Sequence, residues 1–135
     1  MNLSMCASCI FTAAIIDDDA SIGRSLARLL DSYGMAAHVY HSAEAFMEAG
    51  VLGDVDCVVA DMKLPGMSGL ELKNRTNALD PFLPFILLTA YDTPDMRLAA
   101  KHAGVSAFFR KPVDGQALVD AVLWACGSGQ TKQVS

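Results

Sequence analysis

The sequence has no apolar run long enough to cross a membrane, since its most apolar segments fall far short of the roughly 18 residues that a spanning helix needs. The N-terminus also lacks a basic region followed by an apolar one, and it has no clear cleavage site of a secretory signal. These absences predict a cytoplasmic protein that does not enter the membrane.

Basic residues are scarce as well. Lys and Arg together number 10 against 15 Asp and Glu, which gives a formal net charge of −5. A nucleic-acid surface needs clustered basic side chains, and here they are scattered along the chain. We therefore expect no direct contact with nucleic acid, and any DNA-binding output domain has to lie outside this chain.

Only four cysteines are present. Cys6 and Cys9 form a C-x-x-C pattern, but they precede the first apolar run, whereas a redox motif of this kind opens a helix after a strand. Zinc needs about four ligands, and no second Cys or His pair lies at motif spacing. The role of Cys6 and Cys9 stays open. Cys57, in an apolar run, and Cys126, near the end of the last predicted helix, are interpreted as packing residues.

What the chain does contain is four short apolar runs, each followed by polar residues. The runs are Ala13–Ile16, Cys57–Ala60, Phe85–Leu88 and Ala107–Phe109. Short apolar runs between helical patterns are typical of strands buried on both faces of a parallel sheet, and the carboxyl ends of such strands share one edge. We expect the carboxylates after the first two runs, the Thr89 hydroxyl and the Lys111 ammonium to converge there.

Helical patterns and caps fill the intervals between the runs. Ser68 with Glu71 predicts a capping box, and Thr93 before Pro94 predicts a capped helix start. Helices are expected from Ala20 to Tyr33, after Ser42, after Ser68, from Thr93 to about His102 and from about Gly115 to Ala125, with an edge strand at Ala36 to Tyr40. Five β-α units in alternation predict a doubly wound α/β fold.

The acidic cluster carries the chemistry. Like charges in one pocket repel each other unless a cation lies among them, and carboxylates without histidine or thiol suit a hard cation such as Mg²⁺. Asp17, Asp18 and Asp61 are the candidates, whereas Asp19 is interpreted as a helix cap. Asp61 can attack phosphorus in line and form an acyl phosphate, provided that the charge on the phosphoryl oxygens is neutralised.

Four motifs together resemble those of bacterial two-component response-regulator receiver domains, and several connecting stretches resemble the FixJ-like branch. They are Ile16-Asp17-Asp18-Asp19, the stretch from Asp61 to Gly69, Leu88-Thr89-Ala90 and Lys111-Pro112. The resemblance implies a receiver domain over residues 12–126. Residues 1–11 show no pattern that requires structure and are interpreted as an N-terminal extension, and the polar, glycine-rich residues 127–135 are interpreted as a tail or linker start. The resemblance further implies a (βα)5 flavodoxin-like fold with strand order 2-1-3-4-5 and helices on both faces of the sheet.

The resemblance also implies a role for each site residue. Asp61 is the phosphoacceptor. Asp18 and Asp61 bind the metal directly, Asp17 acts mainly through water, and the backbone carbonyl of Lys63 completes the protein ligands. Lys111, after which the family has a cis peptide to proline, pairs first with the Asp61 carboxylate and then with the phosphoryl group.

A switch follows from the same resemblance. Thr89 hydrogen-bonds a phosphoryl oxygen, small Ala90 leaves room for the modified side chain, and the aromatic Phe108 changes rotamer. Phe108 lacks the hydroxyl of a tyrosine, so a mechanism that needs a phenolic hydrogen bond is not supported, and Phe108 as a plain core residue stays open. The face built by the helix from Thr93, the strand at Ala107 and the helix from Gly115 is expected to change shape.

The implied function is a phosphoacceptor signalling domain. A histidine kinase donates a phosphoryl group to Asp61 with Mg²⁺, and the modified domain changes partner binding or dimerises. It is not an enzyme beyond its own phosphorylation and dephosphorylation. Whether the chain is complete or belongs to a longer DNA-binding regulator is open, and FixJ-like similarity favours the latter.

Two other functions compete with this one. A haloacid-dehalogenase-type phosphatase also uses an aspartyl nucleophile, but it usually has a second Asp two residues later, where this chain has Lys63. A flavin- or nucleotide-binding module of the same fold would carry a glycine-rich phosphate loop after the first strand, where this chain has Asp17-Asp18-Asp19.

Overall fold

The structure, a computed structural model, describes residues 11–134 of the 135-residue chain and the side chains of residues 11–127. Cys6 and Cys9 lie outside the described residues. Within the described part of the chain, no helix has both the length and the apolar character needed to cross a membrane.

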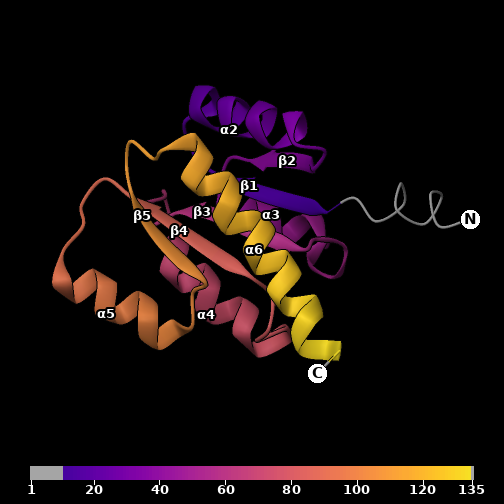
Figure 1. The fold of residues 1–135 in the computed structure, drawn as a ribbon. Helices are drawn as coiled ribbons and strands as arrows, with labels where there is room; N and C mark the ends of the chain where they lie inside the picture. The colour runs from indigo at the N-terminus through magenta and orange to yellow at the C-terminus, as the bar shows by residue number, and fades with distance from the viewer. Residues whose placement is uncertain (1–10, 135) are drawn as a thin grey trace, which may run out of the picture.

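Five parallel strands form one sheet with the order β2-β1-β3-β4-β5, which confirms the predicted topology (Figure 1). The strands are β1 (Thr12–Ile16), β2 (Ala36–Tyr40), β3 (Cys57–Asp61), β4 (Phe85–Thr89) and β5 (Ala107–Arg110). Ile16 pairs with Tyr40 on one side and with Ala60 on the other, so the last residues of neighbouring strands lie at the same level. This common level forms the edge on which the polar residues sit.

Helices cover both faces of this sheet (Figure 1). They are α2 (Ala20–Ser32), α3 (Ala43–Ala49), α4 (Gly69–Leu79), α5 (Pro94–Ala103) and α6 (Gly115–Val134), with a short 3₁₀ helix η1 (Leu52–Asp54). α2 and α6 pack on one face, and α3, α4 and α5 pack on the other. The predicted doubly wound α/β fold is thereby confirmed.

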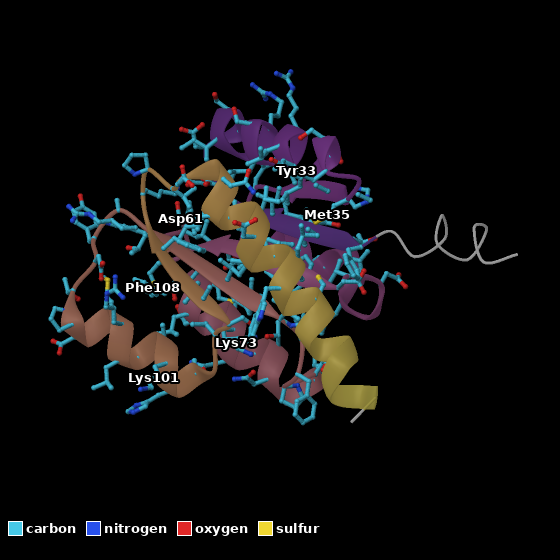
Figure 2. All side chains as sticks on the ribbon, viewed as in Figure 1. Tyr33, Met35, Asp61, Lys73, Lys101 and Phe108 are labelled. Carbon is cyan, nitrogen blue, oxygen red and sulfur yellow. The ribbon has the colours of Figure 1, made fainter. Side chains whose placement is uncertain are left out.

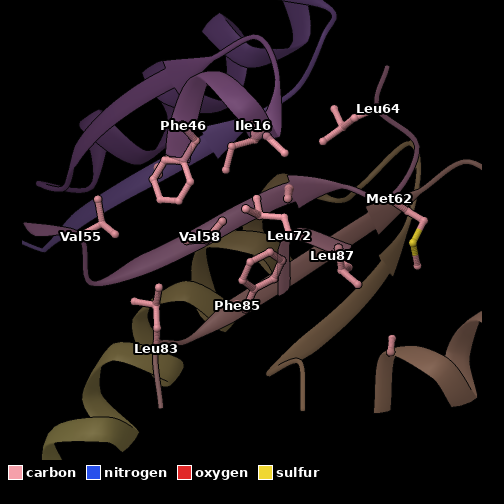
Figure 3. Close-up of a cluster of buried hydrophobic side chains, with 14 residues drawn as sticks. Ile16, Phe46, Val55, Val58, Met62, Leu64, Leu72, Leu83, Phe85 and Leu87 are labelled. Atoms are coloured by element: carbon pink, nitrogen blue, oxygen red, sulfur yellow. The ribbon is translucent and has the colours of Figure 1, made fainter. Parts of the chain in front are cut away.

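Side chains alternate between two cores because successive residues of a strand point to opposite faces. Ile16, Val58 and Leu87 belong to the core under α3, α4 and α5, where Phe46 of α3 and Leu72 of α4 meet them (Figure 3). Their strand neighbours belong to the core under α2 and α6. Each fully buried Leu, Ile or Phe stabilises the fold by roughly 1.5–3 kcal/mol. Burial on both faces explains why the central strands are uninterrupted apolar runs.

The helix starts follow the predicted caps. Asp19 accepts the backbone N–H of Ser21 at 2.9 Å, as expected for a cap. Ser68 and Glu71 form the reciprocal capping box at the start of α4, and Thr93 caps α5 with Pro94 in its first turn. These local hydrogen bonds determine where each helix begins after its strand, and they set the length of each loop at the sheet edge.

The predicted end of the last helix is wrong. α6 continues to Val134, beyond the expected end at about Ala125 and through the segment interpreted as a tail. Gly127 and Gly129 suggested a stop, but a glycine inside a helix costs only about 0.5–1 kcal/mol. A helix already held by packing gains one hydrogen bond for each added residue, and no new nucleation step is required.

Gly69 generates a stability prediction. A Cβ at Gly69 would lie too close to the backbone carbonyl oxygen of Asp61, and it would be 2.9 Å from the Leu87 side chain. Because a backbone cannot move aside cheaply, Gly69→Ala should lower the free energy of unfolding by about 1–3 kcal/mol in urea denaturation. Gly53→Ala, with nothing within 4 Å of the new Cβ, is the control and should stay close to wild type. Equal stabilities of the two variants would contradict the proposed clash.

Candidate functional site

Four strand ends bring the predicted polar residues together. Asp17 follows β1, Asp61 ends β3, Thr89 ends β4 and Lys111 follows β5. The Lys111 N–H donates to the Thr89 carbonyl at 2.7 Å, so the sheet pairing continues to the site itself. Figure 2 shows Asp61 and Phe108 on one side of the molecule, with Met35 towards the opposite side. The site therefore lies at the carboxyl edge of the sheet.

Asp17, Asp18 and Asp61 form an acidic cluster in which one ligand oxygen from each residue lies within 4.8 Å of the others. Asp17 and Asp61 are buried, and Asp18 is exposed. A set of carboxylate oxygens without nitrogen or sulfur ligands suits a hard divalent cation such as Mg²⁺. The donor set therefore fits the metal that the sequence predicted.

Lys111 links the carboxylates. Its Nζ lies 2.8 Å from Asp61 Oδ2 and 3.0 Å from Asp17 Oδ2. Burial opposes the charge on Lys111, but the hydrogen bonds and charges of Asp61 and Asp17 outweigh it and raise the pKa of the ammonium. The peptide between Lys111 and Pro112 is cis, as the resemblance implied.

Backbone donors hold the second oxygen of each buried carboxylate. Asp17 Oδ1 accepts the N–H of Asp19 at 2.9 Å, and Asp61 Oδ1 accepts the N–H of Lys63 at 3.2 Å. The Lys63 side chain is exposed, with its Nζ 5.4 Å from the centre of the Tyr91 ring. Both buried carboxylates are thus oriented on both oxygens before any ligand arrives.

The cluster opens into a cavity of about 430 Å³. Its lining residues are Asp18, Asp61, Lys63, Leu64, Pro65, Ala90, Tyr91 and Lys111. Asp61 and Lys111 thus face a space that is large enough for a phosphoryl group and open to solvent.

Thr89 lies beside the cluster, but its hydroxyl is bonded elsewhere. The side chain is buried; its Oγ1 donates to the Tyr91 carbonyl at 3.1 Å and accepts the Tyr91 N–H at 3.0 Å. The structure therefore brings Asp17, Asp18, Asp61 and Lys111 into contact range, while the Thr89 hydroxyl is engaged by the loop that follows β4.

Phe108 sits in the middle of β5, half-buried against the core beneath α3, α4 and α5. The guanidinium of Arg97 on α5 lies 5.4 Å from the centre of its ring. Two hydrogen bonds of 2.6 Å hold that guanidinium to Asp92, and they lower the pKa of the Asp92 carboxyl. The ring is thus enclosed by the core on one side and by a fixed cation on another.

Glu44 is a site residue that sequence reasoning missed. Its carboxylate accepts the N–H of Met67 at 2.8 Å, and this bond lowers the pKa of Glu44. It braces the loop after Asp61 next to Gly66, whose φ of 75° favours glycine. The two partners are 23 residues apart, and no periodicity relates them. Arg97 and Tyr91 were missed for the same reason, because their contacts arise only in the folded chain.

The chain matches a known protein family over most of its length. Residues 13–123 match the response regulator receiver domain family. The transcriptional regulatory protein FixJ of Azorhizobium caulinodans is 39% identical over 113 residues, which are 84% of this chain and 54% of that protein. The transcriptional regulatory protein TdiR of Thauera aromatica is 35% identical over 82% of this chain and 49% of its own length. The chain thus spans about half the length of these curated relatives.

Solved structures agree with this match. The crystal structure of FixJ-N superposes with a TM-score of 0.76 at 32% identity, covering 87% of this chain and 94% of that one. A CheY-like receiver domain from Methanospirillum hungatei reaches a TM-score of 0.84 at 23% identity over 91% of this chain and 98% of its own, and that likeness supports the fold alone. The expected FixJ-like resemblance is confirmed, and the chain belongs to the response regulator receiver domain family.

Proposed function

We propose that this receiver domain takes a phosphoryl group from the phosphohistidine of a histidine kinase onto Asp61, with Mg²⁺, and then changes its partner binding or dimerises. One observation carries the proposal: Lys111 bridges Asp61 and Asp17 beside Asp18, at the edge of an open cavity. This arrangement offers a nucleophile, a cation to follow the transferred group and a set of metal ligands in one place.

Asp61 is the proposed nucleophile. One of its oxygens attacks phosphorus, a new O–P bond forms, and the P–N bond of the donor breaks with its electron pair leaving on the imidazole nitrogen. Lys111 starts 2.8 Å from Asp61 Oδ2 and is well placed to follow the charge onto the phosphoryl oxygens. The raised pKa of Lys111 keeps that ammonium charged at neutral pH.

Asp17, Asp18 and Asp61, together with the Lys63 carbonyl, would hold the metal. Three carboxylates face one ammonium, so the site keeps a negative excess that a divalent cation offsets. When bound, Mg²⁺ supplies positive charge that stabilises the transferred phosphoryl oxygens. Lys111 and the Lys63 backbone orient the Asp61 carboxylate, and the open cavity gives a phosphoryl donor access to it.

The signal is proposed to pass through Thr89 and Phe108. A phosphoryl oxygen competes with the Tyr91 carbonyl for the Thr89 hydroxyl, which turns towards the site. The space that the Thr89 hydroxyl vacates admits the Phe108 ring, which moves away from the Arg97 guanidinium. The face formed by α5, β5 and α6 then changes shape. Moving a two-state mixture from 1:99 to 99:1 needs ~5.5 kcal/mol, within reach of several charge-assisted hydrogen bonds.

The output is proposed to lie outside this chain. FixJ and TdiR relatives are named as transcriptional regulatory proteins, and a further relative is named as the DNA-binding transcriptional regulator NtrC of Klebsiella pneumoniae. A DNA-binding domain joined to this receiver, or a second copy of the receiver, is the proposed partner of the α5, β5 and α6 face. Catalysis is limited to the domain's own phosphorylation and dephosphorylation.

Phosphorylation is tested with acetyl phosphate and Mg²⁺. The chain should gain one hydroxylamine-labile phosphoryl group by mass spectrometry, and Asp61→Asn should gain none. Asp18→Ala should slow the reaction by more than about tenfold, equivalent to ~1.4 kcal/mol in the barrier, because a metal ligand is lost. Asp19→Asn, which alters a cap outside the cluster, is the matched control and should react like wild type. Label on another residue, or full labelling of Asp61→Asn, would contradict the assignment.

Lys111 generates a pH prediction. Its folded pKa is raised, so its stabilising charge is fully present below the unfolded pKa of about 10.4 and is lost as the pH rises through the folded value. In metal-free urea denaturation, Lys111→Gln should be less stable than wild type at neutral pH, and the difference should shrink above about pH 10.4. Lys101→Gln, at an exposed position on α5, is the control. A Lys111→Gln deficit that stays constant across this range would rule out the ammonium as its source.

The switch is tested with beryllofluoride as the phosphoryl mimic. Wild type should self-associate in sedimentation, or change amide exchange over residues 90–125. Thr89→Ala should bind the mimic without this response, whereas Thr89→Ser, which keeps the hydroxyl, should retain it. Unchanged mass and unchanged exchange in wild type would leave Phe108 as a plain core residue.

A further inference from the structure

Two thiols lie together far from the acidic site. Cys57 is the first residue of β3, and Cys126 lies on α6. Their exposed fractions are 1% and 6%, and both belong to the core between the sheet and helices α2 and α6. Both are free thiols in the structure. The sequence predicted both as packing residues, because Cys57 lies in an apolar run and Cys126 near the end of the last predicted helix.

The fold brings the Cys126 sulfur to the backbone that leads into Cys57. Cys126 Sγ lies 3.9 Å from the carbonyl oxygen of Asp56, the peptide group that leads into Cys57. The Cys57 thiol donates to the carbonyl oxygen of Val58 at 3.7 Å, so both thiols lie against neighbouring peptide groups at the start of β3. The interaction between the two thiols raises the pKa of Cys57 and lowers the pKa of Cys126. Cys126 is therefore the sulfur that ionises first, and it is also the more exposed of the two.

We propose that Cys57 and Cys126 are an oxidisable pair, which peroxide converts into an intramolecular disulfide that cross-links α6 to the start of β3. β3 carries Asp61 at its other end, so this modification site is separate from the acidic cluster. The cross-link ties the last helix of the proposed output face to the strand that carries the phosphoacceptor.

The reaction proceeds in two balanced steps. The Cys126 thiolate attacks one peroxide oxygen, the O–O bond breaks, and the products are a sulfenic acid at Cys126 and hydroxide, which takes up the proton released by the thiol to form water. The Cys57 thiol then attacks the Cys126 sulfur, an S–S bond forms, and a second water leaves. Both cysteines are oxidised by one electron each, and one hydrogen peroxide is reduced to two water molecules.

Burial and contact favour the second step over further oxidation. Sulfenic acid condenses with a thiol when one is within reach, and otherwise it oxidises onward. The Cys57 thiol belongs to the same described core as Cys126, whereas bulky external thiols have little access to Cys126, a residue that is 6% exposed. The proximity of the two thiols thus favours a disulfide, which a reductant can reverse, over irreversible oxidation.

The experiment uses the full chain with Cys6→Ser and Cys9→Ser, which leaves only the two core thiols. The folded protein is treated with hydrogen peroxide, its remaining thiols are blocked with N-ethylmaleimide before unfolding, and peptides are mapped by mass spectrometry. The expected product has lost two hydrogens, carries a Cys57 to Cys126 peptide link, and returns to the free thiols on reduction. Adding Cys57→Ser should abolish the link and leave a sulfenic acid at Cys126 that dimedone traps.

Three results would overturn the proposal. They are a disulfide only between two chains, sulfinic acid at Cys126 with Cys57 still reduced, and two unmodified thiols at peroxide levels that oxidise exposed methionines. The Asp61→Asn version of the same protein must form the link equally well. This control separates failure of the thiol pair from failure of the phosphoacceptor assignment.

Discussion

The ammonium of Lys111 holds the functional edge of this protein together. It bridges the carboxylates that follow β1 and end β3, from a position directly after β5. Without a cation, the like charges of two buried carboxylates in one pocket would repel each other and oppose the closure of the sheet edge. The parallel sheet makes the contact possible, because only parallel strands deliver all their carboxyl ends to one side.

The scaffold and the proposed moving parts are physically distinct. β1, β3 and β4 are buried on both faces, so a shift of their backbones would disturb two cores at once. The Thr89 hydroxyl and the Phe108 ring are held by contacts that can be exchanged, namely two hydrogen bonds to the Tyr91 backbone and a cation above an aromatic face. The proposed nucleophile on a rigid strand, beside exchangeable contacts, is the arrangement that the proposed switch requires.

The two ends of β3 carry different chemistry. Asp61 lies at the carboxyl end among charges and next to a cavity, while Cys57 lies at the other end in an apolar core beside Cys126. Burial sets this difference, since the acidic end borders a cavity open to solvent and the thiol end lies in an apolar core, where a charge is costly. A covalent change at one end can therefore occur without direct contact with the other.

The sequence by itself determined the strands, their order through the family resemblance, the helix starts at Asp19, Ser42, Ser68 and Thr93, and the set of residues at the carboxyl edge. These features depend on local hydrogen bonds and on apolar periodicity, which neighbouring residues encode. Only the tertiary structure decided the engagement of Thr89 by Tyr91, the bracing by Glu44, the Arg97 cation over Phe108, the placement of Cys126 against the backbone before Cys57 and the extent of α6. Such contacts join side chains from different elements, and packing rather than spacing selects their partners.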